Sequence, residues 1–213
     1  MPAEPPLVVS VARALLGWRL ISELGAPGDP TIVATITETE AYGGADDPAS
    51  HAHRGPTPRN AAMFGPAGRL YVYRSYGLHW CANVVVGAVG TPSAVLLRAV
   101  ALEADDPVVA SLMSARRPKA RRPREWANGP GKLAAALAIE GGHNGVDLFD
   151  PGSSLRLIAP DADEAPRPMV ATPRVGISRA THRRWRFLQQ EMGERRRRHE
   201  VIVRMRHSTE AQG

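Results

Sequence analysis

Two carboxylates and a phenol recur at every second position in the segment TETEAY: Glu38, Glu40 and Tyr42. Upstream, Ile32 and Ile36 alternate with small or polar residues, which is the period of a β-strand with two unlike faces. Continuing that period predicts that the glutamates share a face with the isoleucines. A carboxylate at the end of a core-facing row is partly desolvated, which raises its pKa and favours general acid or base chemistry. The alternative is that both glutamates pair with arginines at a strand end.

The four tyrosines of the chain lie close to these carboxylates in sequence, at positions 42, 71, 73 and 76. Aromatic rings beside carboxylates predict walls that sandwich a flat ring. The alternative is a set of core aromatics at β spacing. A buried core uses Phe more often, because a Tyr hydroxyl needs a hydrogen-bond partner.

Histidines and aspartates gather in the same region, where HAH at 51–53 follows Asp46 and Asp47. A zinc site needs three or four His, Cys or carboxylate ligands, and the one cysteine, Cys81, has no partner cysteine. The sequence contains neither H-E-x-x-H nor C-x-x-C. We therefore expect no metal, and His51 is interpreted as a pocket or surface histidine.

Two polar residues interrupt apolar strands further along the chain: Asn83 in WCANVVV and Arg98 in AVLLRAV. A buried arginine needs an anion, and a buried asparagine needs several hydrogen bonds. Each residue either marks a site or is structural, with Arg98 paired to Glu38 or Glu40 and Asn83 satisfying a turn.

Two further segments combine glycine with a basic residue, NGPGKL at 128–133 and PRVGIS at 173–178. NGPGKL departs from the phosphate-loop spacing because Leu133 follows Lys132, so no nucleotide triphosphate site is predicted. A helix N-terminus with a lysine can still hold a backbone phosphate. In PRVGIS, Arg174 precedes Val175 and Gly176, which indicates a close backbone approach or a turn.

Positive charge is unevenly distributed along the 213 residues. The net charge of +6 and the pI of about 10.2 favour a polyanionic partner. Residues 171–213 contain 11 Lys and Arg against 4 Asp and Glu, which is +7 and leaves −1 for residues 1–170. Six basic residues also fall within 116–124. Such runs contact nucleic acid or are solvated loops and tails. The aromatic content of 5% argues against a long single-strand stacking groove.

Periodicity and punctuation predict the elements that position these residues. Helices are expected over 6–18, 107–117 and 129–142. Strands are expected over 31–42, 69–77, 78–87, 93–100 and 154–160. A long loop is expected at 43–69, and the segment 183–207 mixes a helix with the strand-like VIVRM. Successive strands without an intervening helix predict an antiparallel sheet, so the fold class is α+β, in one domain over 1–213 with a basic C-terminal extension over about 188–213.

Membrane insertion and export are not expected. The chain has no run of about 18 apolar residues, and MPAEPPLVVS lacks the basic start and long apolar segment of a secretory signal. A single cysteine excludes an internal disulfide, which fits a reducing cytoplasm.

Six segments of the chain form a series of motifs: ETEAY, DPASHAHRGPTPRNAAMFGPAGRLYVYRSYGLHWCANVV, AVLLRAV, GPGKLAAAL, RVGIS and WRF. In this order they resemble the motifs of the alkyladenine (3-methyladenine) DNA glycosylase family, which occurs in animals and many bacteria. This family is distinct from the helix-hairpin-helix type. The opening VARALLGWRL is similar to the family's first helix. The resemblance runs from about residue 8 to 187 and implies a single mixed domain around a curved antiparallel sheet. It also implies a monomer that acts on double-stranded DNA without metal or other cofactor. The Arg-rich stretch after Phe187 departs from the family pattern, and we expect it to add nonspecific DNA contacts.

The resemblance implies roles for individual residues around the reacting bond. Glu40 matches the general base that activates water for attack on the sugar C1′. Arg98 matches an arginine near that water and near the phosphate of the flipped nucleotide. Val175 matches a residue whose main-chain carbonyl contacts the water. Asn83 matches the residue whose amide clashes with the guanine 2-amino group.

The same resemblance implies the pocket walls and the wedge. Tyr42, His51 and Tyr73 match side chains that stack on the flipped base, and His51 also contributes a hydrogen bond. Tyr76 matches the side chain that enters the minor groove in place of the extruded nucleotide. Further DNA contacts are predicted for three basic residues: Arg59, Lys132 and Arg174.

Together these roles describe a monofunctional DNA glycosylase that excises alkylated or deaminated purines and leaves an abasic site. Extruding a base costs a few kcal/mol, less at a damaged pair. A wedge and a basic surface offset that cost, and aromatic faces attract a cationic alkylated ring. No lysine matches a nucleophile position, so strand cleavage is not expected. Two alternatives stay open: a binding module that senses modified bases without chemistry, and a hydrolase of another sugar substrate.

Overall fold

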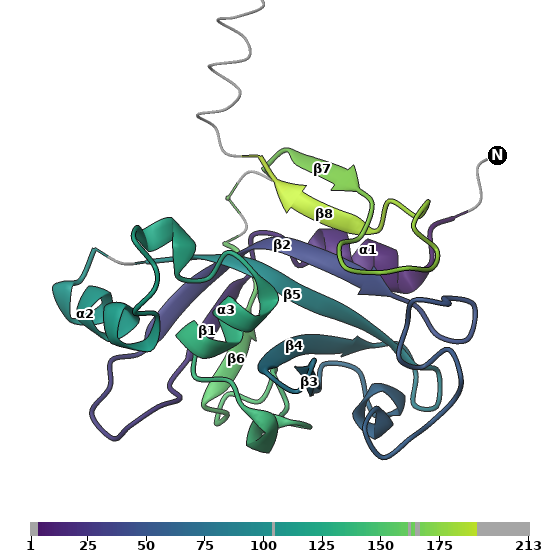
Figure 1. Cartoon of the computed structure of the whole chain (residues 1–213), viewed down its shortest axis with the longest axis horizontal. Helices are drawn as coiled ribbons and strands as arrows, with labels where there is room; N and C mark the ends of the chain where they lie inside the picture. Colours follow the sequence, from purple (N-terminus) through teal and green to yellow (C-terminus); the bar gives the residue numbers. More distant parts are fainter. Residues whose placement is uncertain (1–3, 104, 162, 165–166, 191–213) are drawn as a thin grey trace, which may run out of the picture.

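An eight-stranded antiparallel sheet forms the centre of the computed structural model, which describes residues 4–103, 105–161, 163–164 and 167–190 (Figure 1). The strand order is β3-β4-β5-β2-β1-β6, and β8 pairs with both β2 and β7. The strands are β1 Arg19–Ser22, β2 Ile32–Tyr42, β3 Leu70–Ser75, β4 His79–Val86, β5 Ser93–Leu102, β6 Leu155–Ile158, β7 Met169–Thr172 and β8 Arg186–Gln189. The α+β fold class and the antiparallel sheet are therefore confirmed.

Three α-helices and three short 3₁₀ helices surround the sheet. The α-helices are α1 Leu7–Ala14, α2 Pro107–Arg116 and α3 Pro130–Ala136, and the 3₁₀ helices are Ala61–Phe64, Pro123–Glu125 and Gly141–His143. The Asp106 side chain caps α2 by accepting the Val108 N–H at 2.7 Å, and Pro107 occupies the first turn, where its missing N–H costs nothing.

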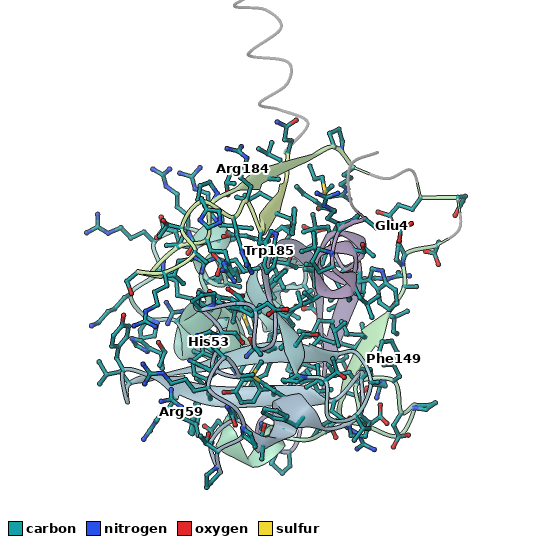
Figure 2. The ribbon with its side chains drawn as sticks, turned by 90° about the vertical axis from the view of Figure 1, so that its right-hand side faces the viewer. Glu4, His53, Arg59, Phe149, Arg184 and Trp185 are labelled. Atoms are coloured by element: carbon teal, nitrogen blue, oxygen red, sulfur yellow. The ribbon has the colours of Figure 1, made fainter. Side chains whose placement is uncertain are left out.

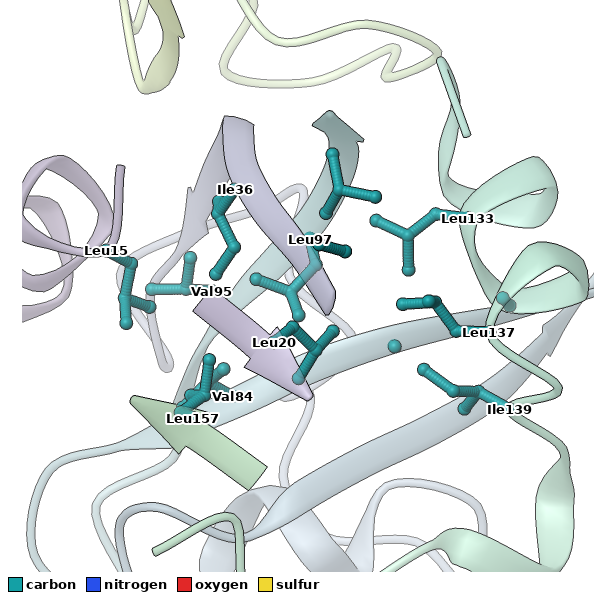
Figure 3. Packing of buried hydrophobic residues seen from close by; sticks show 14 of the residues in the cluster. Leu15, Leu20, Ile36, Val84, Val95, Leu97, Leu133, Leu137, Ile139 and Leu157 are labelled. Carbon is teal, nitrogen blue, oxygen red and sulfur yellow. The ribbon is translucent and has the colours of Figure 1, made fainter. Parts of the chain in front are cut away.

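The main hydrophobic core lies between one face of the sheet and the helices α1 and α3. Figure 3 shows Leu15 after α1 on one side of this core and Leu133 of α3 on the other, with Ile36 and Leu97 of the sheet between them. The opposite face carries a smaller cluster beneath the 43–69 loop: Ala52, Met63, Tyr71, Val85 and Ala94. The sheet thus separates a fully apolar layer from a layer that is rich in tyrosine.

The central strand β2 changes face partway along its length. Ile36 pairs with Val100 and Thr39 pairs with Leu97, but between them Glu38 lies opposite Ala99, which is a β-bulge irregularity in both strands. Because side chains alternate with period 2, this local insertion moves later residues to the other face. Ile36 therefore shares the main core with Ala41 and not with Glu40.

The expected common face of the isoleucines and glutamates is therefore wrong. Before the bulge, the even-numbered residues of β2 point into the main core, and after it the odd-numbered residues do. Thr39 shows the change directly, because its hydroxyl donates to the Ala12 carbonyl of α1 at 2.7 Å. Glu38, Glu40 and Tyr42 face the tyrosine-rich layer instead.

Two further expectations need correction. The first helix ends at Ala14 and not at residue 18, because Gly17 takes a positive φ of 87° and turns the chain into β1, which was not predicted. The described part of 183–207 forms β8 and not a helix, because pairing with β2 and β7 overrides local propensity. Of the basic extension, only residues 188–190 are described, and VIVRM lies outside the described residues.

No helix among the described residues combines the length and the apolar character that crossing a membrane requires. The 43–69 segment contains only one regular element, the single 3₁₀ turn of Ala61–Phe64, as the long-loop prediction anticipated.

Packing at β4 can be tested with two neighbouring glycines. A Cβ on Gly141 would lie 2.6 Å from the Trp80 ring, whereas a Cβ on Gly142 would meet nothing within 4 Å. We expect Gly141→Ala to lower the free energy of unfolding by about 1–3 kcal/mol through overpacking. The control Gly142→Ala should change it by less than about 0.5 kcal/mol. Urea unfolding followed by tryptophan fluorescence measures both, and equal stabilities would contradict this packing.

Candidate active site

A cavity of about 480 Å³ opens on the tyrosine-rich face of the sheet. Eight of the eleven residues predicted to form the site line it: Tyr42, His51, Arg59, Tyr73, Tyr76, Asn83, Arg98 and Val175. Met63, Ala94 and Leu96 complete its apolar floor. The volume lies in the range of pockets that enclose one small organic ligand. Glu40 lies behind this wall, and Lys132 and Arg174 do not line the cavity.

The Glu40 carboxylate is fully buried and held by three residues that line the cavity. Its Oε1 accepts the backbone N–H of Val175 at 2.8 Å, and its Oε2 accepts the Tyr42 hydroxyl at 2.9 Å. The Arg98 Nη1 lies 3.3 Å from Oε2. Strand pairing fixes this arrangement, because Glu40 and Tyr42 of β2 lie opposite Leu96 and Ala94 of β5.

Burial raises the pKa of Glu40 above its ordinary value, although Arg98, the Val175 N–H and the Tyr42 hydroxyl each work to lower it. The neighbouring charge of Glu38 adds to the increase. Burial likewise raises the pKa values of Tyr42 and Tyr73, so both phenols are neutral donors at physiological pH. Glu40 is therefore a carboxyl group with a raised pKa, set between neutral phenols and the charged Arg98.

Arg98 is fixed by the first glutamate of the pair. The Glu38 Oε1 accepts the Nε of Arg98 and the Nε of Arg186, each at 2.6 Å. The arginine pairing considered for both carboxylates is therefore present, and it coexists with a cavity. Glu38 accepts the hydrogen bond from the Nε of Arg98. The Nη1 group of Arg98 is therefore left to extend toward Glu40 and the cavity.

Aromatic rings form one wall of the cavity. The His51 ring meets the Tyr73 ring edge to face, with 4.5 Å between centroids, and its Nδ1 lies 3.0 Å from the Tyr71 hydroxyl. Burial and the nearby Arg59 lower the pKa of His51, which favours the neutral ring. Burial also raises the pKa of Tyr71 to about 12. Tyr71 thus belongs to the wall, as the clustering of the four tyrosines predicted, although no individual role was assigned to it.

Asn83 lies on the cavity floor, where its Nδ2 donates to the Tyr71 carbonyl at 3.0 Å and fixes the orientation of the amide. Cys81 lies two residues earlier on the same face of β4, because alternate residues of a strand share a face. Cys81 carries no sequence signal as a site residue other than its place in this alternation.

Tyr76 projects from the β3–β4 turn at the cavity mouth, with 90% of its surface exposed. Its backbone adopts φ 50°, a left-handed conformation that costs a non-glycine residue free energy. The neighbouring Leu78 is 73% exposed and was not predicted. An apolar tip that is both exposed and strained is suited to insertion into a partner.

Two of the predicted DNA contacts are held close to the site. The Arg59 guanidinium donates to the Arg74 carbonyl at 2.9 Å and lies 5.6 Å from the Tyr73 ring centroid. Lys132, in the first turn of α3, donates to the Asn128 side chain at 2.8 Å on the surface. Figure 2 shows His53 and Arg59 below Trp185; Arg59 lines the cavity.

Arg174 does not lie where a phosphate can reach it. Its side chain has no exposed surface and forms a two-pronged ion pair with Asp47, with the Nη2–Oδ1 distance at 2.8 Å. The expected DNA contact therefore has no support in this placement. Sequence gave no sign of this burial, because the partner lies 127 residues away.

A second cavity of about 370 Å³ adjoins the first and shares Ala49, His51, Gly176 and Ile177 with it. Arg54, Arg179 and His53 line this second cavity, and its described lining contains no carboxylate. Arg54 and Arg179 were not among the predicted contacts. Within the part of the chain that the structure describes, no group of three His, Cys, Asp or Glu side chains is placed to hold a metal ion.

An aromatic-walled cavity beside a buried carboxylate is an arrangement that can hold a planar ring next to an acid–base group. The chain matches the model of the methylpurine-DNA glycosylase family over residues 5–192. The chain therefore belongs to the methylpurine-DNA glycosylase family, which confirms the resemblance seen in its motifs.

Individual relatives cover most of the chain. A protein of Rhodococcus jostii (strain RHA1) is 48% identical over 190 residues, which span 87% of this chain and 77% of that protein. A protein of Mycobacterium tuberculosis (strain CDC 1551 / Oshkosh) is 49% identical over 184 residues, and one of Frankia casuarinae is 45% identical over 195 residues. The last two alignments each span 84% of this chain and 83% of the relative. All three are named "Putative 3-methyladenine DNA glycosylase".

The electrostatics of Glu40 give a direct prediction. In the wild type, Glu40 should titrate above the ordinary range of glutamate, because burial dominates. Arg98→Gln should raise the pKa of Glu40 further by removing the charge that lowers it, whereas Arg98→Lys keeps that charge and should stay closer to the wild type. Carbon-13 NMR of the labelled glutamate side chains measures all three. An unchanged titration in Arg98→Gln would contradict the assigned coupling.

Proposed function

We propose that this protein is a monofunctional DNA glycosylase that flips alkylated or deaminated purines out of duplex DNA and hydrolyses the N-glycosidic bond. Membership of the methylpurine-DNA glycosylase family makes the protein a base-excision-repair hydrolase. The observation that supports the finer proposal is the fully buried Glu40 carboxylate, bonded by three residues that line a base-sized cavity. The substrate is damaged genomic DNA, and the protein acts as a monomer in the cytoplasm.

Glu40 is the general base of this mechanism. Water attacks C1′ of the everted nucleoside, the C1′–N bond breaks, and the bonding electrons leave with the base. Glu40 takes a proton from the water, and its charge stabilises the oxocarbenium-like sugar. The pair of electrons neutralises a cationic alkylated purine, so such a base leaves more readily than a normal one. A neutral deaminated purine leaves as an anion, and the proton that Glu40 took from the water balances that charge when it passes to the departing base, directly or through solvent.

Water access to Glu40 requires one of its present partners to move, because the side chain has no exposed surface. The contact with Arg98 is the longest of the three, at 3.3 Å against 2.8 and 2.9 Å. Glu38 keeps the Arg98 Nε in place at 2.6 Å. The Nη1 end of Arg98 can therefore turn to the phosphate of the entering nucleotide, and water takes its place at Glu40.

The cavity walls select the base. The rings of Tyr42, His51 and Tyr73 attract a cationic purine through their faces, an interaction that strengthens when water is excluded. The amide of Asn83, oriented by its hydrogen bond to the Tyr71 carbonyl, rejects the guanine 2-amino group. Tyr76 enters the minor groove and fills the space that the extruded nucleotide leaves.

The alternative of a binding module without chemistry has the same cavity but no use for Glu40. A protein that only sensed modified bases would gain affinity from the aromatic walls alone. Holding a desolvated carboxylate beside the ligand then costs free energy and adds nothing to the affinity. Catalysis accounts for that cost, and single-turnover release of free base separates the two functions.

The role of Glu40 can be tested with Glu40→Gln. This variant should bind a duplex containing one hypoxanthine or ethenoadenine as the wild type does, because the cavity walls are unchanged. Its single-turnover rate of base release should fall by about 10²–10⁴-fold, the range of a lost general base. The exposed Glu103→Gln serves as a charge-matched control and should excise normally. Normal excision by Glu40→Gln would mean that another group is the base.

The second cavity predicts phosphate contacts beside the base pocket. Each phosphate contact contributes about 0.9 to the slope of log affinity against log salt concentration. Arg54→Gln combined with Arg179→Gln should make that slope shallower by roughly 1.8 while the lesion preference is retained. The matched control combines Arg19→Gln with Arg156→Gln, on β1 and β6 at the edge of the sheet opposite β3. Equal slopes for both double variants would exclude these contacts.

A further inference from the structure

Asp47 and Arg174 form a fully buried ion pair next to the site. The exposed fraction of the two side chains is 1% and 0%, and two hydrogen bonds join the guanidinium to the carboxylate. Burial works to raise the pKa of Asp47, but the bonds from Arg174 and from the backbone N–H groups of Gly43 and Ala49 hold the pKa below its ordinary value. Asp47 is therefore charged throughout the neutral range.

This ion pair joins segments that are far apart in sequence. Arg174 also donates to the Ala41 carbonyl at the end of β2, at 2.9 Å. Its guanidinium lies between two aromatic rings, 4.7 Å from the centroid of Tyr42 and 5.2 Å from that of Trp185. The Arg174 guanidinium therefore packs against Tyr42, which lines the cavity.

Arg174 also precedes the residue that binds Glu40. The Val175 N–H donates to the Glu40 Oε1 at 2.8 Å, one residue after the buried guanidinium. Because Arg174 is held at three acceptors and between two rings, the backbone that follows it has little freedom. The position of the Val175 N–H against the carboxylate depends on that restraint.

Stability alone does not account for the ion pair. Buried ion pairs are weak evidence for stability, because desolvation offsets their attraction. The Arg174 Nε is in addition buried without a hydrogen-bond partner in the described structure, which costs further free energy. An apolar filling of the same space would avoid both costs but would not fix the direction of a backbone N–H.

We propose that Asp47 and Arg174 are positioning residues that hold the Tyr42 ring and the Val175 N–H where both can bond the Glu40 carboxylate. This inference rests on the proposed function of Glu40 as a base. Neither residue touches the reacting atoms. Their effect passes through Tyr42, which bonds Glu40 Oε2, and through Val175, which bonds Oε1.

Arg174→Lys tests the proposal, because lysine keeps the charge but loses the two-pronged geometry and the flat stack. The single-turnover rate should fall at least 10-fold, since displacements of about 1 Å at a reacting group cost up to 10²-fold. Affinity for the lesion duplex should change less than 3-fold. Losing the hydrogen bond from the Val175 N–H should also raise the pKa of Glu40. The acid limb of the pH–rate profile, where activity falls as Glu40 is protonated, should therefore move to higher pH.

The groups that face Glu40 determine how this profile is interpreted. They are Arg98 on β5, Glu38 and Tyr42 on β2, and Tyr73 on β3, and Arg186 on β8 pairs with Glu38. None of them is altered in Arg174→Lys. A shift of the acid limb therefore reports the Val175 N–H or the Tyr42 hydroxyl, which are the contacts that the ion pair is proposed to hold.

Arg116→Lys is the matched control. Arg116 is also largely buried, pairs with Asp29 at 2.9 Å and donates to the Ala136 carbonyl, but it lies away from the cavity. This control should lower stability without moving the acid limb. The proposal would be overturned if the acid limb of Arg174→Lys lay at the same pH as those of the wild type and of Arg116→Lys.

Two further measurements keep the proposal testable. If Arg174→Lys does not fold, Trp185→Leu removes the indole ring that contacts Arg174 and leaves the ion pair between Asp47 and Arg174. This variant should move the acid limb in the same direction. Carbon-13 NMR of Glu40 follows its pKa without any reaction. A wild type that releases no base would refute the proposed function, whereas an unmoved Glu40 titration in the folded variant would refute the positioning role alone.

Discussion

The burial of one carboxylate is the constraint on which the site depends. Moving an ionised carboxylate out of water costs several kcal/mol after relaxation, so a fully covered Glu40 requires fixed donors. They come from three different segments: Tyr42 lies on the same strand, Arg98 on the neighbouring strand, and Val175 in a loop more than 130 residues away. Each donor also lines the cavity, so the residues that solvate the charge are also part of the cavity wall.

The double irregularity in β2 and β5 allows this arrangement. A strand that kept strict alternation would send Glu38 and Glu40 into the hydrophobic layer that contains Ile36 and Leu97. The bulge turns both carboxylates to the opposite layer while Thr39 takes the core-facing position under α1. One strand thereby contributes to a dry hydrophobic core along its first half and to a polar cavity along its second half.

Much of the fold and the chemical identity of the site could be predicted from the sequence. Alternating and helical periods gave the strands around Tyr71 and Asn83 and the helix that begins at Pro130, because local spacing is sufficient for them. The motif order indicated the family, which the family model confirms. The roles that it implied, Glu40 as the base and Tyr76 as the wedge, stay predictions. The strands β1, β7 and β8 were not predicted, because each is only four residues long and is fixed by its pairing with other strands. The equally short β6 was predicted within SLRLIAP.

The sequence by itself determined which residue types are available: an acidic pair, clustered tyrosines and an excess of arginine. Only the tertiary structure decided where each one faces and what charge it meets. Arg174 illustrates the difference, because a basic residue beside a glycine is indistinguishable in sequence from a phosphate contact. Its burial follows from Asp47 and Trp185, which reach it through folding. The physical reason is that alternation and charge are local properties, whereas desolvation and ion pairing depend on chain segments that folding brings together.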